Sequence, residues 1–170
     1  MEPTEKATLL RRIRVWVAVF VVGLVLSGLT AFPLESETAL LNRFFGVSAS
    51  PPMGPEPSLH TWLRRVHEGI AATNRAYPFM AYGTDWLAFA HLVIAVAFLG
   101  PLRDPVRNNW VLVFGVIACL GVVPLAFIAG PIRGIPFYWR LIDSSFGVFG
   151  AIPLLICLRY VDRLERASAS

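Results

Sequence analysis

NNWVLVFGVIACLGVVPLAFIAGPI, residues 108–132, is a run of twenty-five residues without a single Asp, Glu, Lys or Arg. A helix of about twenty such residues crosses the roughly 30 Å hydrocarbon core of a bilayer. Three further stretches lack these charged residues, and they lie at 15–34, 86–102 and 144–158. Because lipid offers no hydrogen-bond partners to the backbone, each stretch is predicted to form a helix.

The composition of the whole chain agrees with a lipid environment. Of its 170 residues, 56% are hydrophobic and 15% are charged, whereas a soluble domain carries roughly a quarter charged residues. This balance excludes a disordered chain, a basic nucleic-acid-binding domain and an ordinary soluble enzyme. We predict an all-α membrane protein, a four-helix transmembrane bundle in one domain (1–170), with helices at about 13–32, 84–100, 109–129 and 142–160.

The first predicted helix also has features of a cleaved signal peptide. Four basic residues precede its apolar run, which ends near the small residues at 27–31. The run is long for the apolar part of a signal peptide, however, and no Ala-x-Ala motif closes it. We therefore expect the first helix to be retained.

Basic residues near the helix ends predict the orientation of the chain. With the N-terminus in the cytoplasm, cytoplasmic segments hold nine of the fifteen Lys and Arg residues and the outer segments hold six. Four of those six lie in one long loop, where charge has less effect on topology. The distribution predicts a multi-pass protein with both termini in the cytoplasm.

The loop at about 34–83 is too long for a simple turn, and we expect it to hold two short helices. Residues 35–45 have an amphipathic pattern that suits the membrane surface. Ser58 is a good N-cap for a second helix that runs to about Asn74. The prolines between them predict a stiff linker; they are Pro51, Pro52, Pro55 and Pro57. The two helices are expected to cap the bundle on its extracytoplasmic side.

Glycine and proline mark the ends and interiors of the predicted helices. Gly100-Pro101 and Gly130-Pro131 are predicted to end the second and third helices. Pro124 and Pro153 lie inside the third and fourth helices and predict kinks there.

Small residues predict the closest helix contact. Gly147 and Gly150 follow two serines and give the fourth helix a face that a neighbour can approach closely. Cys119 and Cys157 fall inside apolar runs and are predicted to be small packing residues.

Three histidines are the first candidates for chemistry. His91 lies inside the second predicted helix, and ionisable residues at membrane depth are rare and frequently functional. His60 and His67 share one side of the loop helix, but their separation of two turns, roughly 10.5 Å, is too large for one metal ion. Either could join His91 and a carboxylate in a metal site. The alternative for all three is a neutral histidine that hydrogen-bonds or borders an apolar face.

Carboxylates and arginines near the predicted outer ends of helices complete the candidate set. Asp85 and Asp143 each come just before a predicted helix, where N-capping is the alternative to a role as metal ligand. Arg133 and Arg140 flank the turn at 130–136. These arginines are candidates for binding an anion or a lipid headgroup, or for pairing with Asp143.

These residues suggest a ligand or metal site on the extracytoplasmic face, built around His91 with His67 or His60, Asp85 and Asp143. A transition metal or haem iron suits that chemistry. The alternatives are an accessory or assembly subunit of a membrane complex without a site of its own, and a small-solute transporter. Expected partners are the lipid bilayer and further copies or a larger membrane complex, but not nucleic acid. The sequence holds no P-loop, G-x-S-x-G or H-E-x-x-H motif.

Three stretches carry a resemblance: GTDWLAFAH (83–91), GPLRDPVRN (100–108), and GPIRGIP with WRLID (130–136 and 139–143). They resemble segments of uncharacterised small four-helix integral membrane proteins of bacteria, over about 77–160. The resemblance implies a bacterial cytoplasmic (inner) membrane location and carries no activity with it. The excess of Arg over Lys also suits a GC-rich bacterial genome.

Overall fold

Helices form every regular element of residues 2–50, 54 and 58–169, which are the residues that the computed structural model describes. In chain order they are α1 (Pro3–Ala31), α2 (Leu34–Phe44), α3 (Ser58–Ala76), the 3-10 turn η1 (Pro78–Met80), α4 (Ala81–Ala97), α5 (Leu99–Arg103), α6 (Asn109–Ile132) and α7 (Phe137–Ala169). Within these ranges, four helical segments are long and apolar enough to cross a membrane: Pro3–Ala31, Pro78–Arg103, Asn109–Ile132 and Phe137–Ala167. The predicted all-α class with four candidate spans is thereby confirmed. The four prolines of the predicted linker lie outside the described residues.

The helices extend beyond the stretches that predicted them. α1 begins about ten residues before its predicted start, and α7 begins about five residues early and ends about nine residues late. A charge-free stretch indicates only the part of a helix that can lie in the hydrocarbon core of the bilayer. Glu, Lys and Arg are good helix formers, so they continue the same helix beyond that length.

The two Gly-Pro pairs lie inside helices, which corrects the prediction. α6 continues through Gly130-Pro131, and Gly100-Pro101 lies inside α5. α6 ends at Ile132, directly after the Gly130-Pro131 pair. Gly134 follows with a φ of 69°, and this turn lets the Gly134 amide donate to the Pro131 carbonyl (3.1 Å) and the Ile135 amide donate to the Gly130 carbonyl (2.9 Å). A proline in the last turn removes a single backbone hydrogen bond, and the glycine cap satisfies the final carbonyls.

Residue contacts divide the chain into two compact units. Unit 1 comprises residues 1–23 and 94–170, and unit 2 comprises residues 24–93. The division falls within α1 and α4, so each of these helices contributes residues to both units.

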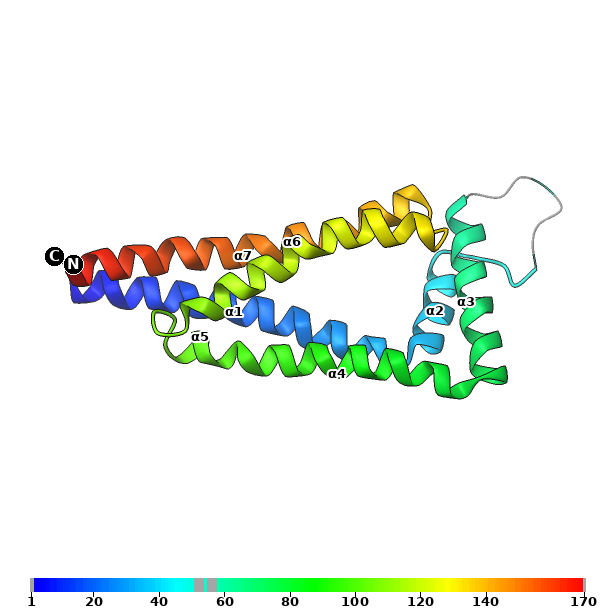
Figure 1. Ribbon diagram of the computed structural model, residues 1–170, viewed down its shortest axis with the longest axis horizontal. Coiled ribbons are helices and arrows are strands. Elements are labelled where there is room, and N and C mark those ends of the chain that lie inside the picture. Colours follow the sequence, from blue (N-terminus) through cyan, green and yellow to red (C-terminus); the bar gives the residue numbers. More distant parts are fainter. Residues whose placement is uncertain (1, 51–53, 55–57, 170) are drawn as a thin grey trace. The chain divides into compact units, whose positions relative to one another are not determined.

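Unit 1 is built from α6 and α7, which lie side by side, and from the first part of α1, which lies beside the end of α7 (Figure 1). The Cys157 thiol donates to the Ile13 carbonyl at 3.7 Å, which fixes α1 against α7. Cys119 and Cys157 are free and buried, which confirms their predicted packing role. The buried apolar side chains of α1 and α7 include Leu9, Ile13, Val17, Ala151, Leu154, Val161 and Leu164.

α7 lies close to α6 at the two predicted glycines. A Cβ atom on Gly147 would overlap the backbone carbonyl oxygen of Cys119 and lie 3.1 Å from Val122 Cβ. A Cβ atom on Gly150 would lie 3.0 Å from Cys119 Sγ. The predicted small-residue face is therefore confirmed, and its neighbour is α6.

Unit 2 contains the two loop helices, which pack as an antiparallel pair, α2 against α3 (Figure 1). Polar contacts mark the register. Near the start of α2, Glu35 pairs with Asn74 near the end of α3, and one turn further along, Thr38 pairs with His67. The first turn after α2 is attached as well, because the buried Arg64 donates to the Ser48 carbonyl at 2.9 Å.

Candidate functional site

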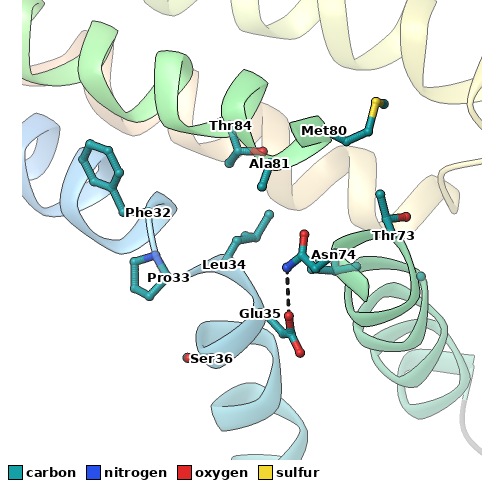
Figure 2. A pocket seen from close by; sticks show the side chains of 12 residues that line it. Phe32, Pro33, Leu34, Glu35, Ser36, Thr73, Asn74, Met80, Ala81 and Thr84 are labelled. Atoms are coloured by element: carbon teal, nitrogen blue, oxygen red, sulfur yellow. Dashed lines mark hydrogen bonds between the residues drawn. The ribbon is translucent and has the colours of Figure 1, made fainter. Parts of the chain in front are cut away.

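A cavity of about 450 Å³ lies in unit 2, where the end of α1 and the start of α2 meet the end of α3 and the start of α4 (Figure 2). A volume of roughly 300–1,000 Å³ is typical of a small-molecule site. The lining residues are Phe32, Pro33, Leu34, Glu35, Ser36, Gly69, Ile70, Thr73, Asn74, Met80, Ala81 and Thr84. Glu35 is the charged residue of this described lining, and it is half-buried.

The polar wall of the cavity is the Glu35–Asn74 pair. Asn74 Nδ2 donates to Glu35 Oε2 at 2.8 Å, and Figure 2 shows this hydrogen bond facing the same space as Leu34. A carboxylate has about four lone-pair positions, so one donor leaves most of its acceptor capacity for a ligand. The Asn74 amide holds the Glu35 carboxylate in place, because a charge-assisted hydrogen bond is stronger than a neutral one.

A second hydrogen-bonded chain supports this wall one turn further along α2. The Thr38 hydroxyl donates its proton to the Glu35 backbone carbonyl at 3.0 Å. Since a hydroxyl has one proton, Thr38 Oγ1 must accept from His67 Nδ1–H across a distance of 3.0 Å. His67 Nδ1 therefore carries a proton in this arrangement. This chain fixes the side of α2 that carries Glu35.

The rest of the cavity is mainly apolar. Phe32, Leu34, Ile70 and Met80 supply its large apolar residues, and the hydroxyls of Thr73 and Thr84 add neutral polar atoms. The turn η1 carries Met80 to the cavity because Pro78 starts a tight turn directly after α3. A ligand with a polar head and an apolar body would match both walls.

His91 does not line this cavity. It lies on α4, and its Nδ1 atom is 2.8 Å from the Leu87 carbonyl oxygen. A carbonyl oxygen only accepts, so His91 Nδ1 carries the proton of this hydrogen bond. The ring lies where the end of α1 crosses α4 closely. A Cβ atom on Gly28 would be 2.9 Å from the Ala88 carbonyl oxygen and 3.1 Å from His91 Cβ.

Asp85 and Asp143 lie in the second turns of their helices, so the prediction that they precede the helix starts is wrong. α4 begins at Ala81 and α7 at Phe137. Prolines begin both segments earlier than the charge pattern suggested, because the ring of proline suits the first turn of a helix. At α7, the Pro136 carbonyl accepts from the amides of Trp139 and Arg140, both at 3.1 Å.

The predicted metal ligands belong to different parts of the structure. His60, His67, Asp85 and His91 belong to unit 2, whereas Asp143 belongs to unit 1. Across the described ranges 2–50, 54 and 58–169, no group of three or more His, Cys, Asp and Glu side chains is placed to hold a metal ion. A metal or haem site around His91 stays a prediction.

The two arginines near the 130–136 turn differ in environment. Arg140 lays its alkyl chain against Gly130, and its guanidinium lies 5.3 Å from the centre of the Phe137 ring, a cation–π contact. Its Nε atom is buried and has no hydrogen-bond partner among the described residues. Arg133 follows the end of α6 and is exposed. Their binding of an anion or a lipid headgroup stays a prediction.

Four residues of this lining were not predicted as site residues: Glu35, Thr73, Asn74 and Thr84. The two loop helices were predicted from their apolar faces, and these four residues are not part of that pattern. A usable signal was present, because each of these four residues lies within a turn or so of a helix end. Helix ends near a long loop are common positions for binding residues.

Comparison with known proteins adds no relative to this description. No family model, curated protein or solved structure matches the chain. The resemblance to small four-helix proteins of bacterial membranes therefore stays a prediction, and the function proposed next rests on the geometry of the cavity.

Proposed function

We propose that the protein is a multi-pass membrane protein that binds a small amphipathic cation in the unit 2 cavity. The observation that carries this proposal is the Glu35 carboxylate, held by Asn74 at the polar wall of an otherwise mainly apolar cavity. A half-buried carboxylate that retains acceptor capacity favours a ligand with a cationic hydrogen-bond donor. The apolar side chains then contact the body of the ligand.

The location of this site follows from the proposed topology. The basic residues support an orientation with both termini in the cytoplasm. The loop between the first two candidate spans, and with it the cavity, would then lie on the extracytoplasmic side of a bacterial inner membrane. The lipid bilayer is the proposed partner of the four apolar segments.

Short-chain probes of equal length and different charge test the proposal. Hexylammonium, hexanol and hexanoate are titrated into the full chain in a neutral detergent, and the thermal midpoint is followed. We expect hexylammonium to stabilise the protein most, because it alone combines a cationic donor with an apolar chain. Glu35→Gln should weaken hexylammonium about tenfold, since a charge-assisted hydrogen bond becomes a neutral one, while hexanol should be unaffected.

A matched control variant separates binding of the probe at Glu35 from partitioning of the probe into the detergent. Gln at position 35 still offers an oxygen to Asn74, so the α2–α3 contact is retained. Glu37→Gln removes the same charge from α2 at a residue that does not line the cavity. Equal stabilisation by hexylammonium and hexanoate, or equal losses in the two variants, would contradict the proposal. An accessory subunit without a ligand site would give that result.

A further inference from the structure

A second cavity, of about 400 Å³, lies in unit 1, and four of its nine lining residues are basic. Three segments of the chain meet there: the start of α1, the connection from α5 to α6, and the end of α7. From the sequence, these basic residues were predicted only to set the orientation of the chain in the membrane. The lining residues are Lys6, Leu10, Arg14, Arg103, Asp104, Pro105, Val106, Arg107 and Leu164.

The wall that carries Arg103 and Arg107 is a rigid loop. Pro101 and Pro105 are fully buried. The Asp104 carboxylate accepts from the Arg107 amide at 3.0 Å, and Asn108 Nδ2 donates to the Asp104 carbonyl at 2.8 Å. These contacts hold the backbone that carries both arginines, and both residues line the cavity.

α1 supplies the facing charges. Arg14 Nε donates to the Leu102 carbonyl at 3.1 Å, which ties the guanidinium to the same loop. Lys6 lies about two turns before Arg14 on α1 and lines the cavity with it. The lining thus has four cationic side chains and one carboxylate, a formal net charge of +3.

We infer that this cavity binds the phosphate of an anionic phospholipid headgroup. Arg and Lys side chains are the common partners of phosphate, and basic pockets between membrane helices bind anionic headgroups. The apolar Leu10, Val106 and Leu164 form part of the same lining and suit the glycerol and first acyl carbons of a lipid. A free phosphate ion shares the charge but has no use for these apolar contacts.

A role in membrane orientation alone does not require basic residues to line one cavity. Arg11 and Arg12 lie on α1 between Lys6 and Arg14 and are exposed, yet neither lines the cavity. Comparing variants of Arg11 and Arg12 with variants of Arg103 and Arg107 therefore separates binding in the cavity from a general attraction to anionic lipid.

Native mass spectrometry of the full chain in neutral detergent tests the inference. Phosphatidylglycerol, cardiolipin and phosphatidylcholine are titrated, and bound lipid is counted. Each basic residue near an anionic surface contributes about fivefold to affinity, so Arg103→Gln with Arg107→Gln should lose about thirtyfold for the anionic lipids. Arg11→Gln with Arg12→Gln, which removes the same charge, should lose less than about threefold. Equal losses in the two double variants would overturn the inference.

A third variant is expected to raise the affinity for anionic lipid, which damage to the fold would not do. Asp104→Asn keeps an oxygen for the Arg107 amide but removes the negative charge from the lining. We expect it to raise affinity for anionic lipid about fivefold. Unchanged or weaker binding by Asp104→Asn would contradict the inference. Displacement of the lipid by sodium phosphate, but not by sodium chloride of equal ionic strength, would assign the site to the free anion and overturn the lipid assignment.

Discussion

At the residue scale, hydrogen bonds from neighbouring residues hold the Glu35 side of the unit 2 cavity wall in place. Asn74 holds Glu35, and the Thr38 hydroxyl directs its proton to the Glu35 carbonyl and accepts from His67. Ordered donors and acceptors of this kind lower the cost of binding, because the site does not reorganise when a ligand arrives. Glu35 is therefore the side chain whose charge has the largest expected effect on ligand choice.

His91 has a different expected role at this scale. Its Nδ1–H donates to the Leu87 carbonyl, and its ring lies outside the cavity lining. We expect His91→Gln and His91→Ala to leave hexylammonium binding unchanged. His91→Ala should lower the free energy of unfolding by about 1 kcal/mol, the usual net value of a hydrogen bond. Thermal unfolding and ligand titration of both variants provide the measurement.

Metal analysis of the same variants tests the alternative role of His91. A transition metal that copurifies in stoichiometric amount with the unmodified protein, is lost in His91→Ala and is not restored by His91→Gln would establish the predicted metal site. Imidazole nitrogen is a good ligand for such metals, whereas an amide is a poor substitute. That result would also show that His91 does more than hydrogen-bond within α4.

At the scale of helices, the contact between α6 and α7 depends on Gly147. A Cβ atom there would overlap the Cys119 carbonyl, and backbone of a packed helix cannot move aside as a flexible side chain can. We expect Gly147→Leu to lower the thermal midpoint of the full chain in detergent clearly. Gly121→Leu on α6 is the control, because a Cβ atom at Gly121 meets nothing within 4 Å. Equal midpoints for the two variants would contradict this packing.

The helices themselves were predictable from the sequence, but their ends were not. The charge-free stretches predicted the four candidate spans of the described residues, because a backbone in lipid must satisfy its hydrogen bonds within the segment and therefore forms a helix. α6 ends at Ile132, and its last carbonyls are satisfied through the turn at Gly134, which has a positive φ. Gly134 lies three residues after Pro131, where the sequence predicted the end of the helix. Local sequence offers Gly130-Pro131 and Gly134 as equally plausible stops, and the hydrogen bonds of the cap decide between them.

The cavity in unit 2 was not predictable from periodicity. Glu35 and Asn74 are thirty-nine residues apart, and their contact depends on the antiparallel register of α2 and α3. Helical spacing reports which residues share a face, but it carries no information about which residues of a second helix they meet. The histidines were predicted as site residues because of their residue type. In the structure, Glu35 and Asn74 line the cavity, whereas His67 does not line it and contacts Thr38.

At the scale of the whole molecule, the distribution of basic residues predicts the topology. Reporter fusions should place residues 50 and 135 outside and residues 105 and 168 in the cytoplasm, because basic segments are retained on the cytoplasmic side. Alkaline phosphatase and fluorescent protein fusions at these four positions provide the measurement. A cytoplasmic signal at residue 50 would contradict the proposed extracytoplasmic location of the cavity.

The most direct test of ligand binding in this cavity uses Met80, which lines it. The labelled methyl group of Met80 reports on a spin-labelled ammonium probe such as protonated 4-amino-TEMPO. We predict that the probe broadens the Met80 methyl signal in the full chain, and that Glu35→Gln removes this broadening while Glu37→Gln does not. Equal broadening of the Met80 signal in the unmodified protein and in Glu35→Gln would contradict a cation site at Glu35.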